Sequence, residues 1–240
     1  MLEKPHSPKW IALMHAITVY YAGPGPAMAA ALAGKPDRPL ATLALGRAFV
    51  CVTHHNVAHH FRFSSRAHAH TNAQGQFVPL GDPANDLFDS HGQPLPNSLT
   101  KSVAGVVLTT PIAAALATLR VQTSATATAA ALNFATQTQQ NPPAYCTSHT
   151  NCAGFAAQVA RAGGVDLAAL AQKAKIRNPL DLLRSFQQAQ RMLTEVTPGI
   201  WTGSLQGKPA ELRYDQPEII VPASRNLAPR TPHTSPNHPR

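Results

Sequence analysis

The sequence predicts an α+β domain in which a small antiparallel sheet packs against helices. Strand-like segments rich in β-branched and aromatic residues concentrate in the first half of the chain, and helical patterns dominate the second half. The 240 residues can bury a sizeable core, as one large domain or as two small ones. Charged residues make up only 13% of the chain, which excludes a charge-driven disordered protein and a coiled coil.

The first half of the chain supplies most of the predicted strands. Residues 16–22 form the first strand, which ends at a segment rich in Gly and Pro. Residues 47–53 and 57–64 are expected to pair as a hairpin that turns near Asn56. Residues 65–100 are rich in Gly, Pro, Asn, Asp and His, which is typical of a long loop.

The second half of the chain is predicted to be mainly helical. A strand at 101–109 leads into a long helix over 110–136, with Thr110 as N-cap and a proline at the first helical position. An Asn-Pro-Pro break follows, and the next helix spans 152–162 and stops at a Gly-Gly pair. Two further helices are expected at 166–176 and 179–193.

These patterns divide the chain into four parts. Residues 1–15 form an N-terminal segment, which we do not interpret as a secretory signal because the apolar stretch that follows has the pattern of a strand. The main domain spans 16–200, and residues 201–221 form a C-terminal hairpin or extension. The tail at 222–240 lacks a hydrophobic pattern and is predicted to be disordered.

The charge balance favours anionic partners. The formal net charge is +9, from 20 basic and 11 acidic residues. No run of Lys and Arg exceeds two residues, which argues against a nucleic-acid or membrane-surface binder unless folding gathers the charge on one face. No apolar run reaches the roughly 18 residues of a membrane span, so we expect no transmembrane segment.

Cys152 is the most informative residue of the sequence because it stands at the start of an amphipathic helix. Free N–H groups at a helix N-terminus carry about half a positive charge, which favours the thiolate. The polar segment 145–151 precedes the thiol, and Phe155 and Val159 are expected to anchor the helix in the core. This is how a nucleophilic cysteine is presented, although a cysteine that only packs fits the same position.

The other two cysteines have simpler interpretations. Cys51 lies within an apolar strand and is expected to be buried there. A bridge between Cys146 and Cys152 would close a small loop, add little stability and consume the candidate nucleophile. Three cysteines exclude both a disulfide scaffold and a four-cysteine zinc site.

The segment Asn151-Cys152-x-x-Phe155, followed by Ala-Gly at the end of the helix, resembles the nucleophile motif of circularly permuted NlpC/P60-like proteins, which include the lecithin retinol acyltransferase-like families. The order of strands, long loop and late Asn-Cys helix over residues 16–165 is also similar. The resemblance implies a papain-like fold with a Cys–His pair and no cofactor.

The same resemblance implies hydrolysis of an amide or thioester bond, or acyl transfer. The substrate would be a peptide or a cell-wall component such as the peptidoglycan stem peptide. Members of similar design include antibacterial effectors, so the resemblance also implies synthesis in the cytoplasm and secretion, or delivery to the periplasm of a target bacterium. A secretion-system or immunity protein would then be a partner.

One departure from the family pattern concerns the general base. The family's histidine lies in a Gly-His-Ala-Phe-like motif, and the matching residue here is Arg47. Arginine stays protonated at neutral pH and cannot act as an ordinary base, although it can stabilise a thiolate. Either the base has moved to another histidine, or the protein is an inactive relative that binds an anionic ligand. The candidates for a moved base are His54, His59 and His60, within a cluster that also includes His55, His68 and His70, and His149 lies three residues before the thiol.

Three more residues near the nucleophile are candidates for binding substrate or stabilising the thiolate: Asn151, Tyr145 and His149. Histidine pairs such as His55-x-x-x-His59 have spacings that metal ligands use. No acidic residue lies between residues 38 and 81, and the His-Glu-x-x-His pattern is absent. We therefore expect no metal site.

Overall fold

The computed structural model describes residues 14–23 and 46–215, apart from residues 75 and 112–114. The expected N-terminal segment 1–15 lies almost entirely outside these residues, and the expected tail at 222–240 lies wholly outside them. The described residues form one antiparallel sheet with helices packed against it, so the α+β class is confirmed.

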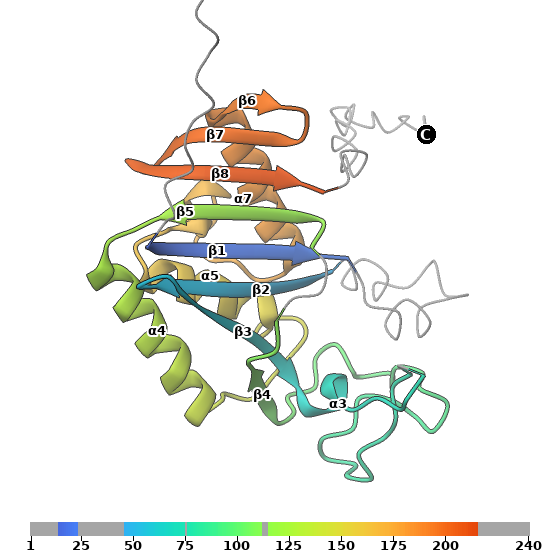
Figure 1. The fold of residues 1–240 in the computed structure, drawn as a ribbon. Helices are drawn as coiled ribbons and strands as arrows, with labels where there is room; N and C mark the ends of the chain where they lie inside the picture. Colours follow the sequence, from blue (N-terminus) through green and yellow to red (C-terminus); the bar gives the residue numbers. More distant parts are fainter. Residues whose placement is uncertain (1–13, 24–45, 75, 112–114, 216–240) are drawn as a thin grey trace, which may run out of the picture.

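The sheet has eight strands in the order β4-β3-β2-β1-β5-β8-β7-β6, and every neighbouring pair is antiparallel (Figure 1). It is therefore larger than the small sheet that the sequence predicts. The strands are β1 (His15–Ala22), β2 (Arg47–His54), β3 (Val57–Ser65), β4 (Gly105–Leu108), β5 (Ala117–Gln122), β6 (Thr194–Thr197), β7 (Ile200–Leu205) and β8 (Lys208–Tyr214). The described helices are α3 (Arg66–Ala69), α4 (Ala125–Gln140), α5 (Cys152–Ala162), α6 (Leu167–Leu170) and α7 (Pro179–Met192).

The two faces of the sheet differ in composition because successive side chains alternate between them. One face carries apolar side chains that are buried under α4, α5 and α7. Helices α5 and α7 lie behind the sheet in Figure 1. We call the opposite face the outer face; no helix of the described ranges covers its centre. The buried apolar set includes Ile17, Val19, Tyr21, Ala48, Val50, Val52, Leu119, Val121 and Leu212.

Local sequence signals correctly predict the hairpin of β2 and β3 and the bounds of α5. His55 and Asn56 both adopt positive φ, of 48° and 64°, so β2 and β3 join through a two-residue turn of the primed type. Helix α5 begins at Cys152 and ends at Ala162, and the Gly-Gly pair follows it as predicted.

The predicted helix over 110–136 is confirmed only from Ala125 onward, where α4 begins with Ser124 as its N-cap in place of the expected Thr110. Its first half contains β5, which lies between β1 and β8 in the sheet. The Ser124 hydroxyl accepts a hydrogen bond from the Ala127 N–H, as an N-cap residue does. In β5, the buried residues Leu119 and Val121 alternate with more exposed neighbours, as expected for a strand. This strand forms because β1 and β8 pair with it on either side.

Other predicted elements are shorter, or belong to larger units. The strand at 101–109 is reduced to β4, and the helix at 166–176 is reduced to α6. The C-terminal hairpin forms as β7 and β8, but β8 also pairs with β5. The hairpin is therefore part of the central sheet. Strand β6, which follows α7 directly, was not predicted.

Candidate functional site

Asn151 positions the start of α5 with every hydrogen-bonding group of its side chain. Its Oδ1 accepts hydrogen bonds from the N–H groups of Ala153 and Gly154, at 3.1 and 3.2 Å. Its Nδ2 donates to the carbonyl groups of Thr147 and Arg177, at 2.9 and 2.6 Å. Because the side chain is only 3% exposed and all of its hydrogen-bonding groups are engaged, Asn151 fixes the start of the helix.

The Cys152 thiol faces the beginning of β2. Its Sγ accepts a hydrogen bond from the Ala48 N–H at 3.5 Å, and the residue is 8% exposed. Burial raises the pKa of the thiol, and the Ala48 N–H and the Arg47 charge offset part of that rise. The thiol is therefore held mainly in its protonated form at neutral pH.

Two arginines lie close to this thiol. The Arg47 charge lowers the pKa of Cys152 and also that of Arg62, for which burial is the larger cause. The ion pairs found among the described residues join Arg184 to Asp181 and Arg213 to Glu211, so neither Arg47 nor Arg62 has a described carboxylate partner.

Arg62 also has an unsatisfied donor. Its Nε is buried and has no hydrogen-bond partner among the described residues. Its guanidinium carbon lies 6.0 Å from the centroid of the Phe49 ring. A buried N–H donor without an acceptor is unfavourable, so this position is suited to an anion.

His68 belongs to the same neighbourhood, although the sequence favoured other members of the histidine cluster as the base. Its Nδ1 lies 2.8 Å from Ser65 Oγ, and its ring lies 5.4 Å from that of Tyr145 and 5.4 Å from that of Phe88. Burial, assisted by the Arg47 charge, lowers the pKa of His68 to about 3. Locally, the sequence shows only that Ser65 can cap the short helix that contains His68. It does not predict that Arg47 lies near His68.

Tyr145 lies near the thiol, as the sequence suggested. It is 6% exposed, and its ring lies 5.4 Å from that of Phe63. Burial raises the pKa of Tyr145, and a negative charge on Cys152 would raise it further. The phenol is therefore neutral and can act as a hydrogen-bond donor at the site.

The histidines that the sequence offered as the base are not brought to Cys152. His54 closes β2 at the end opposite Arg47, about 23 Å away at 3.3 Å per residue, and its Nδ1 lies 2.8 Å from Thr128 Oγ1. His59 and His60 pair with Val52 and Cys51, in the distal half of the same hairpin. No histidine in the described part of the chain makes a hydrogen bond with the Cys152 Sγ.

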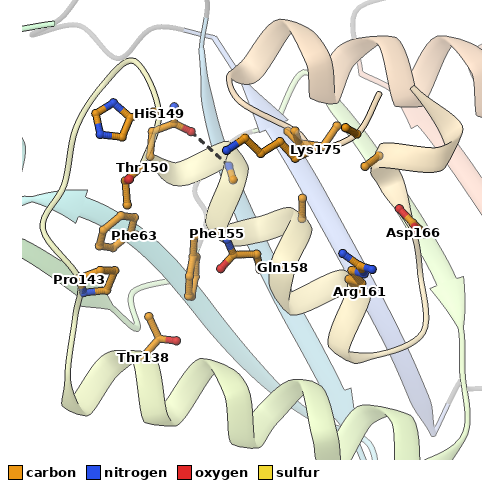
Figure 2. Close-up of a pocket in the computed structure, with 16 residues that line it drawn as sticks. Phe63, Thr138, Pro143, His149, Thr150, Phe155, Gln158, Arg161, Asp166 and Lys175 are labelled. Carbon is orange, nitrogen blue, oxygen red and sulfur yellow. Dashed lines mark hydrogen bonds between the residues drawn. The ribbon is translucent and has the colours of Figure 1, made fainter. Parts of the chain in front are cut away.

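A groove of about 260 Å³ runs along α5 (Figure 2). His149, from the loop before α5, lies at one end, and Arg161 and Asp166 lie at the other. Asn151 and Phe155 contribute to the groove, but Cys152 does not line it. This groove therefore reaches the start of α5 without reaching the Cys152 sulfur.

The described ranges contain neither a cluster of metal-ligating side chains nor a disulfide bond. No three His, Cys, Asp or Glu side chains there are placed to hold a metal ion, and all three cysteines are free. Cys146 Sγ lies 3.4 Å from the carbonyl oxygen of Thr100, whereas Cys152 Sγ faces Ala48. Cys51 is buried in β2, as predicted.

None of the described helices has the length and apolar character that a membrane crossing requires. Comparison of the chain with protein-family models, with curated proteins and with solved structures finds no match.

Proposed function

We propose that this chain is a papain-like domain of the circularly permuted NlpC/P60 type that binds an anionic ligand without hydrolysing it. The ligand would lie at Arg47 and Arg62, beside Cys152. The observation that carries the proposal is the pair of neighbouring arginines with no described carboxylate partner, one of them with a buried and unsatisfied Nε.

An anion between the two guanidinium groups would relieve a local imbalance of charge. The two like charges disfavour each other, since the Arg47 charge lowers the pKa of Arg62. A carboxylate or phosphate would accept charge-assisted hydrogen bonds from both groups. Acidic peptides such as the peptidoglycan stem peptide carry carboxylates of this kind, and we take them as the ligand class.

Hydrolysis lacks a suitable base at this site. Arg47 stands where the family carries its histidine, and arginine does not accept a proton at neutral pH. His68 is too weak a base to take the thiol proton, because its pKa is lowered to about 3. The protonated thiol of Cys152 would then line the binding site without reacting.

Titration calorimetry with a stem tetrapeptide tests this proposal. We expect Arg47→Gln to weaken binding about tenfold or more, because it removes a charge-assisted contact. Arg62→Lys, which keeps the charge but loses the planar donor, should weaken it less than Arg62→Gln. Arg184→Gln is the matched control, since Arg184 pairs with Asp181 elsewhere. Absent binding, or binding indifferent to Arg47→Gln, would overturn the proposal; inorganic phosphate binding alone would reassign the ligand.

A second candidate function is a thiol hydrolase that cleaves a peptide or amide bond, in peptidoglycan if the protein is an antibacterial effector. It is favoured by the position of Cys152 at the first residue of α5 and by the groove that reaches Asn151. Backbone N–H groups at the helix start would form the oxyanion hole.

Alkylation of Cys152 by iodoacetamide as a function of pH separates the two functions, with Cys51 and Cys146 replaced by Ser. An apparent thiol pKa well below 8.5, together with stem-peptide cleavage that Cys152→Ala abolishes, would establish the hydrolase. An inert or ordinary thiol without cleavage would leave binding as the function.

A further inference from the structure

The outer face of the sheet gathers aromatic and basic side chains in two neighbouring rows. The first row runs across four strands, because Cys51 pairs with both His60 and Thr18, and Thr18 also pairs with Arg120. The second row contains Phe49 and Tyr20, which are also paired in register, and Arg62 beside Phe49. The rows lie about 7 Å apart, which is two residues along a strand.

Three basic side chains of this face each have a buried nitrogen without a hydrogen-bond partner in the described chain. The Nε atoms of Arg62 and Arg120 and the Nδ1 of His60 are buried without a hydrogen-bond partner. Glu211 pairs in register with Arg120, but its carboxylate forms an ion pair with Arg213. Three of the four buried polar atoms without a partner thus lie on one face, although the sequence scatters their residues.

The aromatic rings of Tyr20 and Phe49 lie between these cations. Both side chains are half-buried, as expected for rings that lie on a sheet surface. The hydroxyl of Tyr20 interacts with Thr18, two positions back on the same strand and the same face. The Tyr20 ring therefore lies along the strand and can offer a flat surface to a ligand.

The spacing of the charges sets the size of a ligand. Arg62 on β3 and Arg120 on β5 are separated by three strand spacings, which is about 14 Å. The ligand would need anionic groups at least that far apart and planar groups between them. Single-stranded nucleic acid has both, since each nucleotide carries a phosphate and a base that stacks on aromatic or guanidinium groups. An acidic peptide supplies the charges without the planar groups.

We propose that the outer face of the sheet binds single-stranded nucleic acid, with Tyr20 and Phe49 as stacking groups and Arg62 and Arg120 as phosphate contacts. This inference rests in part on the proposed function, because Arg62 belongs to both sites. Arg120 and Tyr20 belong to the nucleic-acid site alone, which allows the two to be tested separately.

Fluorescence anisotropy with a labelled 12-nucleotide oligo-dT tests the inference. We expect Tyr20→Leu to weaken binding at least tenfold and Tyr20→Phe to retain most of it, because stacking requires the ring. Arg120→Gln should reduce the slope of log K against log salt by about 0.7, the value for one phosphate contact on a single strand. Arg184→Gln is the control and should change neither quantity.

Three outcomes would overturn the inference: no binding of oligo-dT, equal affinity of Tyr20→Leu and wild type, or equal affinity for polyglutamate of the same charge. The last would mean that the face recognises charge alone. Arg47→Gln should lose the stem peptide and keep oligo-dT. A protein that binds oligo-dT but no stem peptide would therefore remove the proposed function and leave this inference standing.

Discussion

Asn151 and Cys152 show which part of the site is local in the sequence. An Asn before a helical cysteine can be recognised as an N-cap, and its Oδ1 does accept hydrogen bonds from the N–H groups of Ala153 and Gly154 in α5. That Arg47, Arg62 and His68 lie near Cys152 cannot be predicted from the local sequence. Their proximity depends on how β2 and β3 pack against a helix that begins about a hundred residues later. The helix start could therefore be predicted, and the surroundings of the thiol could not.

His68 should make the protein sensitive to acid. Its pKa is lowered from the ordinary 6.5 to about 3, so the unfolded chain takes up a proton before the folded one. The stabilisation is present above pH 6.5 and is lost as the pH falls toward 3, by an amount on the order of 4 kcal/mol. Urea unfolding at pH 7, 5 and 4 measures this.

The substitution His68→Gln should flatten this dependence, whereas His91→Gln, at an exposed histidine in the long loop, should leave it as in the wild type. If His68→Gln keeps the full loss of stability between pH 7 and pH 4, other groups are responsible.

At the level of elements, prediction succeeded where a turn or a cap decides the structure. The hairpin of β2 and β3 depends on the two residues of its turn, and α5 depends on its N-cap and the glycines that follow. The predicted helix over 110–136 is wrong at residues 117–122, because Ala, Leu and Thr in that segment suit a helix and only pairing with the distant β1 and β8 makes it a strand.

Thr128 joins α4 to the sheet and should be costly to replace. Its side chain is fully buried, and its Oγ1 lies 2.8 Å from His54 Nδ1 and 3.2 Å from His15 Nδ1. Thr128→Val keeps the shape and removes the hydroxyl, so we expect a loss of about 1–3 kcal/mol in unfolding free energy.

Thr138→Val is the matched control on the same helix, because the Thr138 hydroxyl bonds only to the carbonyl of Phe134, one turn back. Its effect on the urea midpoint should be small. Equal effects of the two substitutions would show that the contact with the two histidines does not stabilise the fold.

At the scale of the whole molecule, the C-terminal hairpin of β7 and β8 is an integral part of the central sheet. β8 pairs with β5 along five residue pairs, and Leu205 and Leu212 of the hairpin are fully buried. The sequence indicated a hairpin or extension, but it held no sign that β5 existed to receive it. A local pattern can reveal a hairpin, whereas its docking depends on a strand about ninety residues earlier.

A chain that ends after Thr197 should therefore lose its cooperative unfolding. It leaves β5 as an unpaired edge at the centre of the sheet, which favours aggregation. Gel filtration and thermal melts should show aggregates and a broadened transition, while a chain that ends after Asp215 melts as the full chain does. A shortened chain that stays monomeric with a sharp transition would show that the first five strands fold independently.

The strand order also determines when the thiols become protected during synthesis. β1 can pair with β2 once residue 54 has been synthesised. Its other edge stays unpaired until β5 is complete at residue 122, and β5 in turn can pair with β8 only after residue 214 has been synthesised. The contact between Ala48 and Cys152 closes a span of 104 residues, so it forms late. Until then Cys146 and Cys152 are close neighbours on a flexible chain, and an oxidant could join them. The yield of native protein should therefore depend on a reducing environment until the last strand has paired.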